Sequence, residues 1–212
     1  ETYILVAEGI VSVTGYTPAT PFGISVYAMG RENANSTGNT DVLVHHGSTD
    51  APTVDIFELN AGTLVDDAAY GDFAGYLELP TADYKLQIKD ETGTNVVASY
   101  DAPLATLNLE DSAITVIASG FLNPANNSDG PAFGLFVALA AGGELVELPT
   151  FTPTARVQAI HNSADAATET VDVYLTTALG SSLLIDDFSF RNASPFIDAP
   201  AEENIRISFA PA

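Results

Sequence analysis

Two short runs of this sequence place histidine, serine and aspartate at one spacing, which could serve acid–base, nucleophilic or metal chemistry. Residues 46–51 and residues 161–166 both have the order His-x-Ser-x-Asp-Ala. Nucleophilic catalysis needs a serine beside a general base, an orienting third group and an oxyanion site. The chain has no Gly-x-Ser-x-Gly elbow, three histidines and no cysteine. We therefore expect no catalytic residues, no cofactor and no enzyme activity.

The repeated histidines are predicted to anchor turns. His45 and His46 are adjacent, and successive side chains of a strand point to opposite faces, so regular geometry does not let them share a metal ion. Buried polar groups need partners, so we expect His46 and His161 to bond to the Ser and Asp side chains that follow them. Asp50 and Asp165 are expected to hold the same turns by accepting nearby backbone N–H groups.

Two acidic pairs are the candidate metal ligands. Asp66 and Asp67 end a short apolar run, and Asp186 and Asp187 end a similar one. With neighbouring carboxylates they could offer oxygens to calcium, which takes six to eight. No Asp-x-Asp-x-Asp-Gly loop is present. We expect solvated acidic turns at these positions, with calcium as the alternative and no other metal.

Three Asn-x-Ser/Thr sequons begin at Asn35, Asn126 and Asn192. The first two lie in loops rich in Asn, Ser and Gly, where a glycan would be tolerated. All three are candidate glycosylation sites.

The elements that position these residues are expected to be strands, because short alternating runs of Val, Ile, Tyr, Phe and Thr recur between Gly, Pro, Asn and Asp. The predicted strands are residues 3–7, 24–28, 41–45, 54–58, 76–79, 84–89, 95–100, 114–118, 135–140, 156–160, 171–175 and 205–209. Alternation places Asp55 and Asp172 on exposed faces. The predicted core residues are Val54, Ile56, Leu77, Leu79, Leu86, Ile88, Val116 and Phe136.

Several segments recur along the chain, which indicates repeated structural units. His46 returns as His161, 115 positions later, and Gly9 returns as Gly120, 111 positions later. We predict the C-terminal part of a β repeat at 1–40, a complete β-sandwich at 41–154 and the N-terminal part of a further repeat at 155–212. Ile207 is aligned with Ile88 in this scheme.

The motif His-x-Ser-x-Asp-Ala-Pro at 46–52 is followed by a Val-Asp-Ile-Phe strand at 54–57, by Gly-Tyr-Leu-x-Leu-Pro at 75–80 and by Tyr-x-Leu-x-Ile at 84–88. This series resembles the bacterial secreted repeat known as domain of unknown function 4397, more loosely in the second copy. The resemblance implies tandem β-sandwiches on exported surface proteins, and it carries no catalytic residues. The expected fold class is all-β, with tandem immunoglobulin-like antiparallel β-sandwiches in an extracellular or cell-surface location.

Composition limits the partners. The 212 residues include 6 Lys and Arg against 28 Asp and Glu, a formal net charge of −22. That balance excludes nucleic acid, which needs cationic side chains, and disfavours an anionic membrane surface. No apolar run is long enough to span a bilayer, so membrane insertion is not expected. Because the chain opens at Glu1 without an initiator Met, we expect a processed protein or a fragment.

The leading functional hypothesis is a structural subunit or segment of an extracellular filament or adhesin stalk. Copies would join head to tail, each partial repeat completing the other by strand donation. The alternative is that neighbouring repeats are covalently continuous and that these 212 residues are part of a longer array. The residues predicted to fill the neighbour's core are Ile4, Val6, Ile24 and Val26.

The alternative is a carbohydrate- or surface-binding module, since eight tyrosines could stack on surface glycans. Tyr16, Tyr70 and Tyr100 lie near predicted turns and are the candidates for such stacking. The absence of Trp counts against this alternative.

Overall fold

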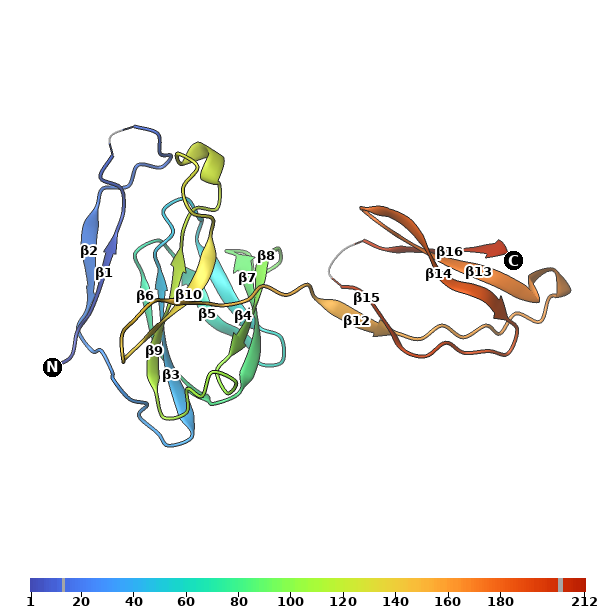
Figure 1. The fold of residues 1–212 in the computed structure, drawn as a ribbon, viewed down its shortest axis with the longest axis horizontal. Coiled ribbons are helices and arrows are strands. Elements are labelled where there is room, and N and C mark those ends of the chain that lie inside the picture. The colour runs from blue at the N-terminus through green and yellow to red at the C-terminus, as the bar shows by residue number, and fades with distance from the viewer. Residues whose placement is uncertain (13, 202–203) are drawn as a thin grey trace. The chain divides into compact units, whose positions relative to one another are not determined.

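The computed structural model describes residues 1–12, 14–201 and 204–212 and divides the chain into two compact units, Glu1–Phe151 and Thr152–Ala212 (Figure 1). Among these residues the helices are two 3₁₀ turns, Pro124–Asn126 and Ala166–Thr168. Neither has the length or the apolar character that crossing a membrane requires. The prediction of an all-β chain is confirmed.

The first unit contains a two-stranded hairpin and two larger sheets. Its strands are β1 (Ile4–Glu8), β2 (Gly23–Tyr27), β3 (Asn39–His46), β4 (Val54–Glu58), β5 (Gly62–Ala68), β6 (Phe73–Pro80), β7 (Asp83–Asp90), β8 (Val96–Pro103), β9 (Ala113–Ser119), β10 (Gly134–Leu139) and β11 (Val146–Glu147). Five strands form a sheet in the order β11-β10-β9-β3-β6, and four form another in the order β5-β4-β7-β8. Every pair is antiparallel except β3 with β9, which run parallel.

The two larger sheets enclose one apolar core and form a two-layered, sandwich-like body. Five of the predicted core residues, Val54, Ile56, Leu86, Ile88 and Val116, are buried in it. Two more, Leu77 and Leu79, are partly buried against it.

Two predictions about which side chains face the core are wrong. Phe136 is only half-buried, while its neighbours Leu135 and Val137 are buried in the core, so the alternation of β10 is offset by one residue. Asp55 was expected on an exposed face but is 5% exposed. Its Oδ1 accepts the N–H of Asp67 at 2.9 Å, across a β-bulge between β4 and β5.

The sequence analysis missed three strands longer than two residues: β5, β14 and β15. In β5 and β14 an acidic pair interrupts the alternation that would have marked a strand. Asp67 and Asp187 adopt left-handed φ values of 53° and 48° at these points. An extra residue of this kind breaks the two-residue period on which strand prediction depends.

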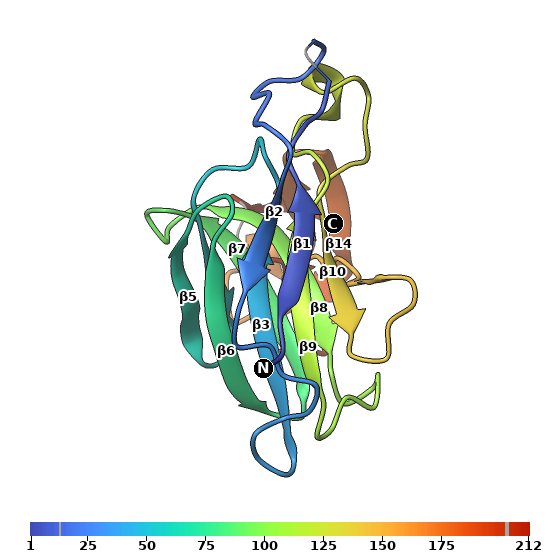
Figure 2. The same cartoon turned by 90° about the vertical axis from the view of Figure 1, so that its left-hand side faces the viewer.

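The N-terminal hairpin, β1 with β2, lies over the outer face of the five-stranded sheet (Figure 2). Glu8 anchors it there, because its Oε2 lies 2.9 Å from Nε2 of the buried His45, and Ser25 also bonds to this carboxylate. The ring of Tyr27 packs on Phe73 with the centroids 5.4 Å apart. One face of the hairpin therefore packs against its own unit.

The second unit contains five strands, β12 (Thr154–Val157), β13 (Thr170–Thr177), β14 (Gly180–Ser189), β15 (Ile197–Pro200) and β16 (Arg206–Pro211). They form a two-stranded sheet, β12-β15, and a three-stranded sheet, β14-β13-β16. Its fully buried apolar cluster is small, with Val171, Val173 and Phe188 at its centre.

Shortening Ile88 tests the core of the first unit. Ile88 is 2% exposed, so Ile88→Ala should lower the free energy of unfolding by about 2–5 kcal/mol through lost burial and a residual cavity. Denaturant unfolding followed by circular dichroism measures the change. The matched control is Val97→Ala, at an exposed position of β8, which should change stability by less than about 0.5 kcal/mol. Equal effects of the two variants would contradict this core.

Candidate functional site

The N-terminal hairpin has the pairing register of β9 and β10. Ala7 lies opposite Ile24, as Ala118 lies opposite Leu135. The turns that follow also agree, because isolated parallel bridges join Ile10 to Pro21 and Phe121 to Ala132. Gly9 and Gly120 both have a φ of 83°, and a Cβ on either would overlap a backbone carbonyl oxygen. The hairpin is thus built like β9–β10, at a separation of 111 residues.

The apolar face of this hairpin is exposed where the face of β9–β10 is buried. Leu5, Ile24 and Val26 are 63%, 61% and 54% exposed. The corresponding residues of β9 and β10 are Val116, Leu135 and Val137, which are 6%, 3% and 0% exposed. The apolar side chains that fill the core at β9 and β10 therefore have apolar counterparts on the hairpin that face outward.

The second unit repeats the pairing of strands β3 to β7. The register of β12 with β15 matches that of β3 with β6, and β13 pairs with β14 as β4 pairs with β5, including both bulges. Strand β16 pairs with β13 as β7 pairs with β4, which places Phe209, not Ile207, at the position of Ile88. The sequence alignment was therefore two residues off. Among the described residues of this unit, no strand corresponds to β8, β9, β10 or β11.

An apolar groove lies in the second unit, in which no described strand corresponds to β9 or β10. Its volume is about 490 Å³, and its lining includes Ala159, His161, Val171, Phe188 and Phe209. The corresponding cavity of the first unit has a volume of only about 20 Å³, because side chains of β9, of β10 and of the turn before β10 fill the space. Those side chains are Val116, Ala118, Phe133 and Leu135. Their counterparts on the N-terminal hairpin are Leu5, Ala7, Phe22 and Ile24.

In the first unit, the His-x-Ser-x-Asp motif fastens the loop that follows β9. Oδ1 and Oδ2 of Asp50 accept the backbone N–H groups of Leu122 and Asn123, both at 2.8 Å. The Ser48 hydroxyl donates to the carbonyl of Gly120 at 2.7 Å. The prediction that Asp50 accepts nearby backbone N–H groups is wrong, because the backbone N–H groups that it accepts lie more than 70 residues away in sequence. Within the motif, Asp50 accepts only the Ser48 hydroxyl, at 3.4 Å. We call these bonds of Ser48 and Asp50 to the loop after β9 the motif clamp. The spacing of the motif residues in the sequence does not indicate these distant partners.

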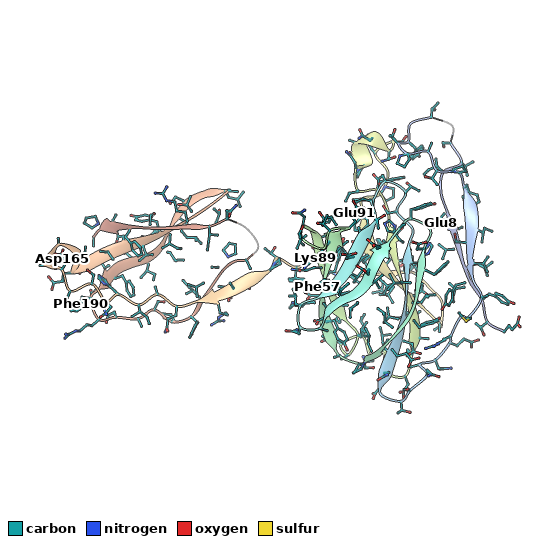
Figure 3. All side chains as sticks on the ribbon, turned by 180° about the vertical axis from the view of Figure 1, so that it is seen from behind. Glu8, Phe57, Lys89, Glu91, Asp165 and Phe190 are labelled. Atoms are coloured by element: carbon teal, nitrogen blue, oxygen red, sulfur yellow. The ribbon has the colours of Figure 1, made fainter. Side chains whose placement is uncertain are left out.

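In the second unit, the same motif bonds within its own turn (Figure 3). Asp165 Oδ1 accepts the N–H of Ala167 at 2.9 Å, and Ser163 bonds to the Thr168 hydroxyl at 2.8 Å. Asp165 and Ser163 are exposed, whereas Ser48 is fully buried. Among the described residues, the Ser and Asp side chains of this motif therefore bond only within their own turn.

Both motif histidines are buried and bond to backbone carbonyls. Nε2 of His46 lies 3.0 Å from the carbonyl oxygen of Pro52, and Nε2 of His161 lies 2.7 Å from that of Thr168. Each ring spans the turn between two strands, as a turn anchor does. Nδ1 of His161 also accepts the backbone N–H of Ser163 at 3.3 Å. The partners of both rings are therefore backbone groups and not the Ser and Asp side chains that were expected.

The four residues predicted to fill a neighbour's core do not share a face. Ile24 and Val26 point outward, but Ile4 and Val6 are half-buried on the same side of β1 as Glu8, which bonds to His45 of its own unit. Leu5 and Ala7 occupy the outward positions of β1. The outward face of the hairpin consists of Tyr3, Leu5, Ala7, Phe22, Ile24 and Val26.

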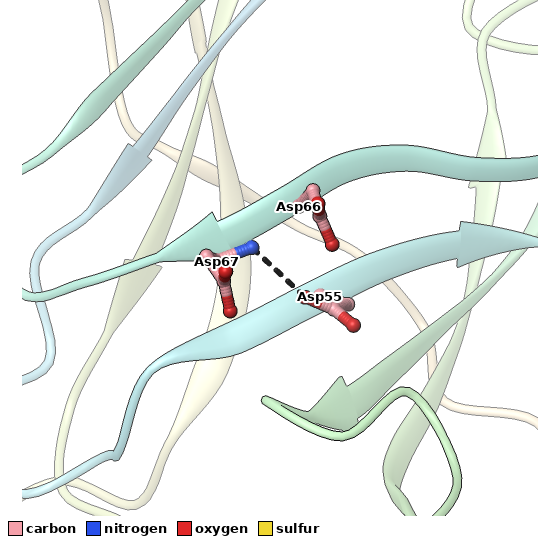
Figure 4. A group of neighbouring side chains, drawn as sticks. All are labelled: Asp55, Asp66 and Asp67. Carbon is pink, nitrogen blue, oxygen red and sulfur yellow. Dashed lines mark hydrogen bonds between the residues drawn. The ribbon is translucent and has the colours of Figure 1, made fainter.

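The predicted acidic pairs each meet a third carboxylate. Asp66 and Asp67 lie with Asp55, with one carboxylate oxygen from each within 4.8 Å of the others (Figure 4). In the second unit, Asp186 and Asp187 meet Asp172 in the same way. Three carboxylates supply part of the oxygen shell that calcium takes, so these clusters are where calcium would be held.

The remaining predicted positions are the glycosylation sequons and the tyrosines considered for glycan stacking. Asn35, Asn126 and Asn192 are all exposed, as acceptors of glycans must be. Of the tyrosines considered for stacking on sugars, Tyr100 is buried in the core and Tyr16 packs on Phe121 with centroids 5.8 Å apart.

Removing the Asp50 carboxylate tests the clamp. Asp50→Ala should lower the stability of the first unit by about 1–3 kcal/mol, because the backbone N–H groups of Leu122 and Asn123 lose their acceptor. Hydrogen exchange at these two amides should accelerate, whereas Asp50→Asn, which keeps one acceptor oxygen, should have a smaller effect. Unchanged exchange in Asp50→Ala would show that the carboxylate does not hold this loop.

Residues 40–131 match the family model described as "Domain of unknown function (DUF4397)". The match begins in β3, includes the motif clamp and ends just before β10. No curated protein and no solved structure matches the chain. Residues 40–131 are therefore a domain of the DUF4397 family.

Proposed function

We propose that this chain is a structural subunit of an extracellular filament or stalk, in which the N-terminal hairpin of one copy completes the second unit of the next. The observation that carries the proposal is the match between an exposed apolar face and an open apolar groove. The hairpin presents Leu5 and Ile24, and the groove lacks their counterparts Val116 and Leu135. Burying such side chains is worth roughly 25 cal/mol per Å² of apolar surface.

The register of docking follows from the first unit. There β9 runs parallel to β3, with Val116 beside Val44 and Ala118 beside His46. The same geometry in the assembly places β1 of one copy parallel to β12 of the next. Leu5 then lies beside Ala159, and Ala7 lies beside His161. Donation of strands adds main-chain hydrogen bonds to the side-chain contacts.

The motif of the second unit supplies a polar lock for this contact. Asp50 accepts N–H groups from Leu122 and Asn123, and the equivalent groups of the hairpin belong to Val11 and Ser12. On docking, Asp165 exchanges its local bond to Ala167 for these donors. Hydrogen bonds to a charged acceptor are about twice as strong as neutral ones, so the lock favours the correct register.

The two faces of the hairpin have different partners in this proposal. The inward face stays on its own unit through Glu8 and Tyr27, while the outward face enters the neighbour. Each copy thus offers one hairpin and one groove, and such a heterologous contact builds an open filament unless rotation closes a ring. The completed second unit would be a sandwich of immunoglobulin-like type, in tandem with the first.

Extracellular placement is part of the same proposal. It rests on the resemblance of the motif series to an exported repeat and on the net charge of −22. Strong like charge keeps exposed sheets from pairing indiscriminately. The tyrosines considered for glycan stacking are largely engaged within the fold, so the structural role is favoured over a carbohydrate-binding module.

Placing a charge on the outward face of the hairpin tests assembly. Wild-type chain should grow in mass with concentration by light scattering, and electron microscopy should show linear particles. Leu5→Asp should stay near 22.1 kDa, because a carboxylate cannot enter an apolar groove without a large desolvation cost.

The matched control is Val97→Asp, a charge at an exposed apolar position outside the hairpin, which should assemble like the wild type. A wild-type chain that remains a monomer at all concentrations would contradict the proposal. Equal assembly of Leu5→Asp and wild type would contradict it as well.

A further inference from the structure

We infer that one proton, held between His45 and Glu8, fastens the N-terminal hairpin to its own unit, so that this attachment weakens as the pH rises. His45 lies in β3 and is 0% exposed. Glu8 is the last residue of β1 and reaches the ring of His45 from the hairpin. The inference goes beyond the proposed function, because Glu8 lies on the inward face of the hairpin and not on the face that enters a neighbour.

Both ring nitrogens of His45 face oxygen acceptors. Nδ1 lies 3.1 Å from the carbonyl oxygen of Asp72, and Nε2 lies 2.9 Å from Oε2 of Glu8. A carbonyl oxygen can only accept, and a neutral imidazole has one N–H. The carbonyl of Asp72 is also held in place, because it accepts the N–H of His46 at 3.1 Å. The arrangement therefore needs one proton more than a neutral ring and a carboxylate contain.

The surroundings favour a charged ring over a protonated Glu8. The Ser25 hydroxyl donates to Oε1 of Glu8, and a hydrogen bond to an ionised acceptor is stronger than one to a neutral acceptor. The ring of Phe73 stacks on that of His45, with the centroids 4.2 Å apart, and an aromatic face attracts a cation. The attached hairpin therefore pairs an imidazolium with a carboxylate.

The other two histidines provide an internal contrast. His46 and His161 each bond through Nε2 to a backbone carbonyl. Nδ1 of His161 accepts the N–H of Ser163 and therefore carries a lone pair. Nδ1 of His46 has no hydrogen-bond partner among the described residues. A neutral ring satisfies the bonds of both, whereas His45 needs a second ring proton.

The other groups around His45 do not ionise with it near neutral pH. The Asp72 carboxylate accepts the N–H of Ala69 at 2.9 Å. Burial, and then the charge of Glu8, raise the pKa of the Tyr70 hydroxyl, so Tyr70 stays neutral. The neighbouring strands contribute a hydroxyl from β2, an aromatic ring from β6 and an aliphatic side chain from β9. The pair of His45 and Glu8 is therefore the proton site of this interface.

The direction of the effect follows from counting protons. When the hairpin leaves its unit, His45 and Glu8 meet water, where a histidine is neutral above about pH 6.5 and a glutamate is ionised. Attachment of the hairpin therefore takes up one proton. An equilibrium that takes up one proton becomes less favourable by at most about tenfold for each unit by which the pH rises. The hairpin should therefore open more often at alkaline pH.

The packing beside this pair is incomplete, so apolar contacts there do not replace it. A cavity of about 350 Å³ lies between β1 and the end of β9, and its lining includes Val6, Glu8 and Ile117. The loop between β1 and β2 has a separate contact, because the N–H of Thr17 donates to Oδ1 of Asn127 at 2.9 Å. That contact contains no titratable group. The pH dependence should therefore be seen in β1 and β2 and not in this loop.

The first test reads the ring nitrogens directly. The full chain carries Leu5→Asp, which keeps the outward face of the hairpin from docking on a neighbour, and its histidine rings are labelled with ¹⁵N. Nuclear magnetic resonance at about pH 7, where a solvated histidine is largely neutral, should show both nitrogens of His45 protonated. His46 and His161 should each show one unprotonated nitrogen. An unprotonated nitrogen on His45 in the folded chain would overturn the inference.

Hydrogen exchange at the hairpin amides tests the consequence. After correction for the intrinsic exchange rate, protection of the amides of β1 and β2 should fall at least about fivefold between about pH 6.5 and about pH 8.5. Protection of the Ile88 amide, in the core of the same unit, should stay constant. Constant protection of the hairpin amides over this range would contradict the inference.

Glu8→Gln in the same chain isolates the proton. The new carboxamide N–H donates to an unprotonated Nε2, while a neutral His45 still donates from Nδ1 to Asp72, so attachment takes up no proton. The hairpin should stay attached, and its protection should lose the pH dependence. Glu32→Gln, which removes an exposed carboxylate, is the matched control and should keep it. Equal pH dependence with and without Glu8→Gln would overturn the inference.

If Glu8→Gln loosens the hairpin at every pH, the ring spectrum of the Leu5→Asp chain still decides the outcome. Assembly of the wild type is measured separately by light scattering. A wild type that stays a monomer would contradict the proposed function and leave the protonation of His45 unaffected, whereas a neutral His45 ring in a chain that assembles would contradict only the inference drawn here.

Discussion

An apolar face of a β-sheet must be covered by a second layer of side chains, and the organisation of this chain depends on that requirement. In the first unit, Val116 and Leu135 complete the layer and are almost fully buried. Among the described residues of the second unit no strands supply this layer, and an apolar groove lies there. The N-terminal hairpin has the corresponding residues, Leu5 and Ile24, on its outward face. In the proposed assembly, the outward face of the hairpin of one copy would be buried in the groove of the next.

The His-x-Ser-x-Asp motif of the first unit has a structural role that its residue types do not suggest. Histidine, serine and aspartate suggest catalysis, but His46 spans a turn and Asp50 holds a loop more than 70 residues away. The motif thus bonds the loop after β9 to the turn between β3 and β4. In the second unit, where no described strand corresponds to β9, Asp165 is exposed and bonds locally.

Much of the fold could be predicted from alternation, and the failures have physical causes. The expected strand at 54–58 has those bounds in the structure, as β4. Asp55 was misassigned because bulges beside it turn its carboxylate toward the N–H of Asp67. Ile4 and Val6 were placed on the wrong face because both faces of β1 are apolar, and alternation cannot then decide which one points outward. The partners of Asp50 were missed because they depend on chain topology and not on local spacing.

Cross-linking gives the most direct test of the central claim, because the chain contains no cysteine of its own. The proposed register puts Leu5 of one copy beside Ala159 of the next, at the separation of neighbouring strands that a disulfide can bridge. A chain carrying both Leu5→Cys and Ala159→Cys should form, on mild oxidation, a ladder of multiples of 22.1 kDa in a denaturing, non-reducing gel. The pair Ile4→Cys and Ala159→Cys, with one thiol on the other face of β1, should not. Monomers alone, or a cross-link closed within one chain, would contradict head-to-tail assembly through the hairpin.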